Sequence, residues 1–511
     1  MRAVMPWKAM TTEGRCPVVQ VVANRYGNWR KPSTYGIGGV GVVTTVAAFA
    51  GIILAVIVTM LSTLLYGVGV FGVIVALGAT VGLRDYDEQS LGSRLVRRTA
   101  WWRARRKRAN VYRSGPLGRT HWGRYQLPGL LAGSRLSEHM DSYGRPFALV
   151  HVPSRGHWTV VMAGDPNGDA LVDEDRIHRQ VASWGDYLRE MGFEPAIEQV
   201  TVTLESVPAT RAKLRREVQS RMDANASEFA RETLAQTVAG AHDSSPDLNA
   251  YVAITVKGSV GGRRRAAEEV GEDVASRLPM LTAGLERAGM TDVRPMSAQQ
   301  VCELVRVSYD PAAATVIDRA HAEGKVPSLS WGDVGPSAAE EHWQSYRHDS
   351  AMSVTWAMTR APEGMVDSAV LQPMISAHRL FPRKRVTLMY RPISPYRAAH
   401  VVESDKRNAM VRANSDKGTA AGSRALQETT QTAEEQAAGH GLTNFSMLVT
   451  ATVEPGTNMR EVQAGMDELG AGRVRLRPAY GSQAGAFAAS LPVGVVIPDH
   501  LRVPTELREK L

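Results

Sequence analysis

The chain has 511 residues, which is too long for one hydrophobic core and favours about three domains. Its apolar content of 44% and charged content of 22% are typical of a globular protein. The net charge of +9 is confined to one segment, because twelve Lys or Arg and only three Asp or Glu lie between Arg84 and Arg124. This distribution excludes a uniformly basic nucleic-acid-binding domain. The two cysteines, Cys16 and Cys302, exclude a disulfide framework and a cysteine-rich metal site.

The N-terminal region contains a long uncharged stretch, 32–83. A helix needs about 20 apolar residues to cross the bilayer core. The stretch therefore predicts a transmembrane helical hairpin over 37–83, with spans near 37–60 and 65–83. Basic residues flank it on both sides, which predicts a multi-pass protein of the cell (inner) membrane with both termini in the cytoplasm. The segment 1–36 is then a cytoplasmic N-terminal arm.

A basic juxtamembrane segment, 84–130, follows the predicted hairpin. Its centre reads WWRARRKR, and this run has two competing interpretations. Tryptophan and basic residues next to a membrane favour the lipid interface, where each cation adds about 1 kcal/mol of attraction to anionic lipid. Rings and cations also suit single-stranded nucleic acid. We favour contact with anionic lipid and keep direct DNA contact as the minor alternative. The predicted interface residues are Trp101, Trp102, Arg103, Arg105, Arg106, Lys107 and Arg108.

The rest of the chain has the pattern of a mixed α/β protein. PFALVHVP and HWTVVMAG predict two strands joined by a turn at SRG. Apolar residues at helical spacing predict helices over 177–191, 211–239 and 266–288. QVTVTLESVP and YVAITV predict further strands.

Three landmarks recur in the same order, which indicates an internal duplication. HWTVVMAGDPNG is echoed by SVTWAMTRAPEG, VTLESVP by VTLMYRP, and MTDVRPMSAQQ by AGRVRLRPAYGSQ. In the first landmark the alignment pairs Met162 with Met358. The repeated landmark residues are Pro166, Gly168, Arg294, Pro295 and Gln300 in the first copy and Pro362, Gly364, Arg477, Pro478 and Gln483 in the second.

The repeat predicts two related cytoplasmic α/β lobes. We place the first at 131–322 and the second at 338–511, with a Gly-, Pro- and Ser-rich linker at 323–337. The expected fold class is thus α+β and membrane-anchored: a two-helix transmembrane hairpin followed by two α/β lobes.

No motif for catalysis, a cofactor or a metal ion is evident, so we predict no enzyme, no catalytic residue, no cofactor and no metal site. His348-Asp349-Ser350 holds the residue types of a catalytic triad, but adjacency in sequence is not triad geometry. Asp173-Glu174-Asp175-Arg176 reads as the start of a helix. The basic run 383–385 reads as a solvated strand entrance, and SVGGRRR at 259–265 as an exposed turn.

Parts of the chain resemble known secretion proteins. YGNWRKPSTYGIGG followed by an apolar stretch resembles the two-helix PrgI/VirB-type membrane subunit of type IV secretion systems. RKRVTLMYRPISPYRAA and LRPAYGSQAGAFAASLPVG resemble the non-motor N-terminal domain of the CagE/TrbE/VirB transport ATPases, although no Walker motif of a motor follows here. The layout resembles actinobacterial conjugation-associated membrane proteins, and more weakly the type VII secretion component EccE.

The resemblance implies a non-enzymatic inner-membrane structural subunit of a conjugative, type IV-like DNA or protein transfer apparatus, which docks a separate motor ATPase. The alternative it leaves open is an EccE-like component for protein secretion. The implied partners are anionic membrane lipid, a separate VirB-type motor ATPase and other secretion-channel subunits, with self-assembly also expected to occur in such a platform.

Overall fold

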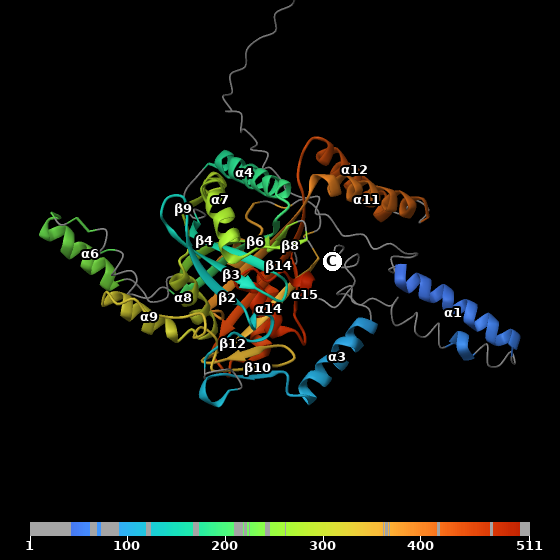
Figure 1. Ribbon diagram of the computed structural model, residues 1–511, viewed down its shortest axis with the longest axis horizontal. Helices are drawn as coiled ribbons and strands as arrows, with labels where there is room; N and C mark the ends of the chain where they lie inside the picture. Colours follow the sequence, from blue (N-terminus) through green and yellow to red (C-terminus); the bar gives the residue numbers. More distant parts are fainter. Residues whose placement is uncertain are drawn as a thin grey trace, which may run out of the picture.

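The fold is α+β, with one long antiparallel sheet and helices on both of its faces (Figure 1). The computed structural model describes residues 42–61, 69–72, 91–118, 124–166, 173–208, 218, 222–223, 225–240, 246–260, 262–360, 362, 366, 368–415, 420–470 and 474–500.

The strands alternate with helices along the chain in both halves. Their bounds are β1 Val111–Arg113, β2 Arg135–Met140, β3 Pro146–Val152, β4 His157–Pro166, β5 Ile197–Pro208, β6 Pro246–Lys257, β7 Ser259–Val260, β8 Arg263–Arg264, β9 Met290–Pro295, β10 Ala338–Glu341, β11 Tyr346–His348, β12 Ala351–Arg360, β13 Arg383–Ile393, β14 Leu442–Val453 and β15 Arg475–Pro478. The helices are α1 Val42–Leu61, α3 Leu91–Arg106, α4 Glu174–Phe193, α6 Glu228–Gly240, α7 Ala267–Arg287, α8 Ala298–Tyr309, α9 Ala313–Ala322, α10 Gln372–Ile375, α11 Pro395–Ser415, α12 Ala420–Ala437, α13 Met459–Gly470, α14 Gln483–Ser490 and α15 Ile497–His500.

The sheet has a repeated order on the two sides of its centre. The path β1-β10-β11-β12-β14-β13-β5-β6-β4-β3-β2 runs outward from the central β13–β5 pair as β13-β14-β12-β11 on one side and β5-β6-β4-β3 on the other. In addition β15 pairs with β12, and β9 with β4. The predicted lobes are therefore not separate bodies: both halves of the chain share a single sheet.

The centre of the sheet is a local two-fold axis. Strands β5 and β13 are antiparallel, and Thr203 lies opposite Thr387. These two threonines are also the middle residues of the two VTL sequences, so each is opposite its own counterpart. Their hydroxyl oxygens are 3.5 Å apart.

The ladder also fixes which residues correspond in the first landmark. Met162 is paired with Pro295, and Trp356 with Pro478. Trp356, not Met358, thus occupies the position of Met162, two residues from the sequence alignment. An alignment error of two residues leaves each side chain on the same face of the strand. The apolar pattern of the two strands therefore looks equally similar in the wrong and the correct alignment.

Helices cover both faces because their apolar residues form stripes. On one face α8 and α14 pack over strands from both halves, in a shared core that includes Val305, Phe487, Val150 and Leu448. On the other face α4 and α7 cover the first half and α10 and α13 the second, each pair with a core of its own. In α7 the buried Val270, Val274, Leu278, Leu281 and Leu285 recur every three or four residues, as a helix packed on one side requires.

Polar pairs are built into the shared core at equivalent places. Thr159 and Thr255 lie on β4 and β6 with their hydroxyls 3.0 Å apart. Ser353 and Thr452 lie at the matching positions of β12 and β14, 2.8 Å apart. Because a buried hydroxyl is costly when it has no partner, pairing them satisfies both inside the core.

The end of the chain crosses from the second half onto the first. Leu491, Val493 and Val495 are almost fully buried in the shared core. Gly494 lies against the Thr159–Thr255 pair so closely that a Cβ there would be 1.8 Å from the Thr159 hydroxyl. His157 then contacts Asp499 at 3.3 Å. We call residues 491–496 the C-terminal strap.

The predicted transmembrane hairpin is not found. Among the residues described, no helix combines the length and the apolar character required to cross a bilayer. The two spans were predicted from the absence of charge over 32–83, and of this stretch the structure describes 42–61 and 69–72. Of the second predicted span only 69–72 is described, and those four residues are helical. The membrane-anchored fold and the multi-pass inner-membrane location that we predicted are wrong on this finding.

The segment 323–337, predicted as a linker, packs against the body. Val334 is fully buried, and the Trp331 indole donates to the Ser134 hydroxyl at 3.0 Å. Arg306 donates to the Gly335 carbonyl at 2.7 Å. These contacts tie the connection between the halves to both α8 and the turn before β2.

Candidate functional site

Helix α3 carries most of the predicted interface run and is fastened to the second half of the sheet by one of its two tryptophans. The Trp101 ring meets Trp343 edge to face at 5.5 Å, and Trp343 stacks on Tyr480 at 5.8 Å. Gly481, with φ of +69°, donates its N–H to the Trp343 carbonyl at 2.9 Å. The aromatic clamp of Trp101, Trp343 and Tyr480 therefore fixes the end of α3.

The second tryptophan and the cations of the run face outward. Trp102 is 55% exposed, and the Arg106 guanidinium lies 4.8 Å from its ring. Arg105 lies in the same way over Trp101, at 5.3 Å. The other exposed cations are Arg98, Arg103, Lys107 and Arg108. The run predicted as one interface is thus divided between an anchoring residue and an exposed basic surface.

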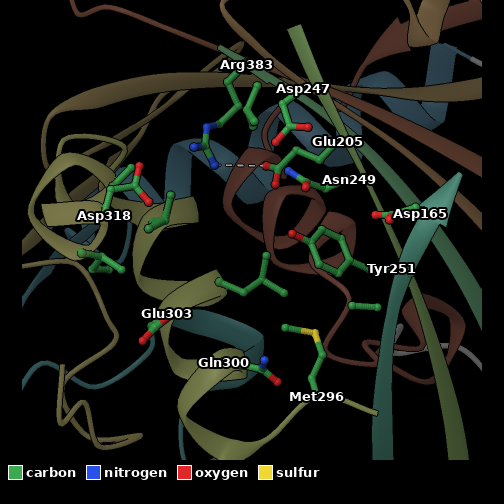
Figure 2. A pocket seen from close by; sticks show the side chains of 18 of the residues that line it. Asp165, Glu205, Asp247, Asn249, Tyr251, Met296, Gln300, Glu303, Asp318 and Arg383 are labelled. Carbon is green, nitrogen blue, oxygen red and sulfur yellow. Dashed lines mark hydrogen bonds and ion pairs between the residues drawn. The ribbon is translucent and has the colours of Figure 1, made fainter. Parts of the chain in front are cut away.

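A cavity of 420 Å³ lies in the first half, between the sheet and helices α8 and α9 (Figure 2). Strands β4, β5 and β6 form its floor, and α8 and α9 form its wall. This volume is in the range of about 300–1,000 Å³ that is usual for ligand pockets. Among the described residues, its acidic and basic lining consists of Asp165, Glu205, Asp247, Glu303, Asp318, Arg294 and Arg383.

A buried ion cluster closes the inner end of this cavity. Glu205 on β5 lies opposite Arg385 on β13 and accepts from it at 2.8 Å and from Arg383 at 3.3 Å. Burial alone would raise the pKa of Glu205, but the two guanidiniums lower it below its ordinary value. Arg385 also donates to the hydroxyl of Ser308 on α8 at 2.7 Å. The cluster joins the two halves of the sheet to the helix that walls the cavity.

The basic run 383–385 was therefore misinterpreted as a solvated strand entrance. Lys384 is 1% exposed and Arg385 3%. Lys384 donates to the Ser376 carbonyl at 2.6 Å, just beyond the last residue of α10, and burial lowers its pKa to about 8. The sequence signal that could have identified this is Glu205 in the equivalent central strand, since a carboxylate in a buried strand requires a cation.

The repeat landmarks occupy corresponding places, but their glutamines act differently. Arg294-Pro295 ends β9 and Arg477-Pro478 ends β15. Gln483 is fully buried and its amide bonds both the N–H of Thr355, at 2.8 Å, and its carbonyl, at 3.1 Å. Gln300 instead closes a capping box at the start of α8.

Of the remaining landmarks, the two prolines lie at or just after the ends of corresponding strands. Pro166 ends β4 and lies opposite Met290, and Pro362 follows β12. Gly168 and Gly364 lie outside the described residues. The described landmarks therefore mark corresponding places in the two halves, and two of them, Arg294 and Gln300, line the cavity of the first half.

His348 lies inside the shared core and is 0% exposed. Its Nδ1 is 2.5 Å from the Tyr309 carbonyl, so this nitrogen carries the proton. Its Nε2 then accepts from the Ser353 hydroxyl at 2.8 Å. Burial lowers the pKa of His348 to about 4. Asp349 and Ser350 bond elsewhere, Asp349 to Ser337 and Ser350 to Asp310, so the three adjacent residues do not form a triad.

The acidic run at 173–176 and the SVGGRRR segment belong to secondary-structure elements and not to a functional site. Asp173 precedes α4, with Glu174 and Asp175 in its first turn, as the helix-start interpretation predicted. SVGGRRR forms the two-stranded β7–β8 turn, with Gly262 at φ of +83°. Within the described residues no three His, Cys, Asp or Glu side chains lie close enough together to bind a metal ion.

Comparison with known proteins gave one partial similarity. A family described as a domain of unknown function (DUF8461) matches residues 33–93, which include α1 and the start of α3. No curated protein matches the chain.

Proposed function

We propose that the chain is a non-enzymatic structural subunit of a conjugative, type IV-like transfer apparatus, and that it provides a docking platform for a separate motor ATPase. The observation that carries the proposal is the way the two halves are joined. Strands β5 and β13 pair directly, and Glu205 and Arg385 are bonded across that pair inside the core. A platform for a motor has to transmit force without bending, and a continuous sheet does so better than two lobes on a linker.

The segments that resemble the non-motor domain of the transport ATPases support the proposal. RKRVTLMYRPI forms β13, and LRP with the following helix forms the end of β15 and α14. These elements make up the centre of the second half. On this proposal, the second half works beside a motor supplied by another protein.

The docking arm we propose is the helical hairpin of α11 and α12, which extends away from the sheet (Figure 1). Its exposed apolar side chains include Tyr396 at 80%, Met410 at 47% and Val411 at 62%. Exposed apolar residues clustered on one element are typical of protein-binding surfaces.

The test is a binding measurement between the 511-residue chain and a RecA-type transport ATPase of a type IV-like system from the same organism. We expect the wild type to bind, and Met410→Glu with Val411→Glu to weaken binding at least about tenfold, since a buried charge at an interface costs more than 1.4 kcal/mol. The control is Glu403→Ala with Arg407→Ala, which changes an exposed ion pair on α11. Absence of binding by the wild type would refute the motor-docking function. Specific binding of small exported helical proteins in its place would point to the EccE-like role.

A further inference from the structure

Most of the charged side chains that line the cavity of the first half already have a partner. The ion pairs between described residues are Glu205 with Arg383 at 3.3 Å, Glu303 with His321 at 3.0 Å, and Arg294 with Asp292 at 3.1 Å. Asp247 and Asp318 have interaction partners as well. The lining therefore offers little unpaired charge of either sign, and it does not call for a charged guest.

The groups that remain for a guest are mainly neutral hydrogen-bonding groups. Tyr251 on β6 is enclosed by the protein, which raises the pKa of its phenol, so the hydroxyl keeps its proton at neutral pH. This hydroxyl points into the cavity (Figure 2). Asn249 lies two residues earlier on β6, and therefore on the same face of the strand. Neither the Tyr251 hydroxyl nor the Asn249 carboxamide has a hydrogen-bond partner among the described residues.

Two further polar groups border the same space. Gln300 on α8 accepts the Ser297 N–H at 2.9 Å through its Oε1, which leaves the two Nε2 hydrogens without a partner in the described part of the chain. The carboxylate of Asp165 on β4 likewise has no partner among the residues described. The cavity thus presents an amide donor, a carboxylate acceptor, and two groups that both donate and accept. Since an enclosed polar group without a partner is costly, the set indicates a guest that supplies several hydrogen bonds.

Apolar side chains lie between these polar groups. They are Val207, Met296, Leu304, Val307 and Ile317. A guest that fits must therefore combine hydrogen-bonding groups with carbon surface. A small ring that carries hydroxyl groups does so, because its hydroxyls both donate and accept while its C–H groups contact apolar side chains. A cavity of 420 Å³ lies at the small end of the usual range for ligand pockets, which suits a compound of this size.

We propose that the cavity binds an uncharged, polyhydroxylated ring compound of the sugar or cyclitol class. Tyr251 and Asn249 bind hydroxyl groups of the guest from the floor of the cavity. Gln300 donates to the guest from the wall, and the Asp165 carboxylate accepts from its hydroxyls at the end of β4. This inference does not rest on the docking of a motor, which we assign to α11 and α12, so either proposal can fail without the other.

The test is isothermal titration calorimetry of the 511-residue chain with glucose, galactose, ribose and myo-inositol, each alone. At least one of them is expected to bind the wild type with a dissociation constant below about 1 mM. Raising the salt concentration should change this affinity by less than a factor of about two, because the guest is uncharged. Tyr251→Phe removes only the hydroxyl, and Asn249→Leu replaces the carboxamide by an apolar group of similar shape. Each should weaken binding at least about tenfold, since a hydroxyl of the guest then lacks its partner inside the cavity.

Tyr143→Phe is the matched control. It removes the same hydroxyl from a tyrosine that is 70% exposed in the turn between β2 and β3, and it should leave the affinity unaltered. The thermal midpoint of each variant shows whether it is folded, and Tyr251→Phe alone decides if Asn249→Leu does not fold. The proposal is overturned if none of the four compounds binds the wild type, or if folded Tyr251→Phe binds as tightly as the wild type. Tighter binding of glucosamine or gluconate than of glucose would also overturn it, because the site would then select a charge.

Discussion

His348 belongs to a chain of hydrogen bonds that links the two halves of the shared core. Thr452 bonds Ser353 at 2.8 Å, Ser353 donates to Nε2 of His348, and Nδ1 donates to the carbonyl of Tyr309 at the end of α8. Every step uses the neutral imidazole. Protonating Nε2 would place a second donor against the Ser353 hydroxyl and a charge at a fully buried position.

This burial makes stability depend on pH in a defined window. The folded pKa of His348 is lowered from 6.5 to about 4, so above pH 6.5 the residue is neutral in both states and contributes no pH dependence. As the pH falls below 6.5, His348 binds a proton in the unfolded chain but stays neutral in the folded chain. The free energy of unfolding therefore declines until about pH 4. At about 1.4 kcal/mol per pH unit the loss amounts to roughly 3 kcal/mol. Urea denaturation at several pH values measures it.

His348→Gln is the matched variant, because glutamine retains one donor and one acceptor but does not titrate. Its stability should fall less between pH 6.5 and 4 than that of the wild type. His151, His378 and His500, whose pKa values are also lowered by burial, contribute equally to both proteins and cancel in the difference. Equal slopes for the two proteins would show that His348 is not held neutral.

At the scale of single elements, Trp101 packs the end of α3 against the body of the protein. Trp101→Ala removes the edge-to-face contact with Trp343, which is worth about 0.5–1.5 kcal/mol in addition to the apolar area that it buries. We expect trypsin to cleave between Arg103 and Arg108 at least about tenfold faster in this variant, since a local opening cost reduced by 1.4 kcal/mol raises the open population tenfold.

Trp102→Ala is the control for this experiment. Trp102 is 55% exposed and its described ring partner is Arg106 on the same helix. Its removal should change the cleavage rate by less than a factor of about three, because an exposed cation–π contact is worth only about 0.5–1 kcal/mol. Similar acceleration in both variants would mean that the clamp does not hold α3.

The sequence predicted secondary structure correctly where an uninterrupted run of apolar residues marked a strand. The strands 146–152 and 157–166 were evident from their apolar runs and form the predicted hairpin. Strands β10 and β11 were not predicted, because four and three residues are too few to show the alternation of apolar and polar side chains that marks a strand. The transmembrane prediction rested on the absence of charge over 32–83 and was wrong, since no described helix has the length and apolar character to cross a bilayer. The basic residues of β13 were misplaced because their partner, Glu205, is distant in sequence.

At the scale of the whole molecule, the ion cluster at the two-fold axis breaks the symmetry. Glu205 and Arg385 face each other across β5 and β13, and the equivalent pair on the other side of the axis is Met389 and Thr201. Glu205→Gln should lower the free energy of unfolding by about 3–5 kcal/mol, because it leaves Arg385 buried without its carboxylate. Denaturant unfolding measures this change.

The symmetric pair supplies the rescue variant. Glu205→Met with Arg385→Thr installs the residues found at the equivalent positions and removes both charges together. It should recover most of the stability lost by Glu205→Gln, since a buried ion pair replaced as a unit is often neutral. A double variant as unstable as the single one would indicate that the cluster, and not the unpaired charge, stabilises the junction.

The duplication was visible in sequence, but its geometry was not. Three ordered landmarks indicated two related units, and their order is that of the strands in each half. Nothing in VTLESVP or VTLMYRP shows that the two strands pair with each other at Thr203 and Thr387, because either sequence would fit the centre of an independent sheet. Strand pairing between distant segments depends on tertiary packing, which local patterns do not encode.

The C-terminal strap has a consequence for biosynthesis. Leu491, Val493 and Val495 complete the shared core over strands made some three hundred residues earlier, and Gly494 seals the Thr159–Thr255 pair. A ribosome-bound chain can form the hairpins of its first half, and α8 covers part of the shared-core face, but the rest of that face stays uncovered until α14 and the strap emerge. Nascent chains are therefore exposed to premature association through this face, and a chaperone that shields apolar β-sheet surfaces would act on them during most of translation.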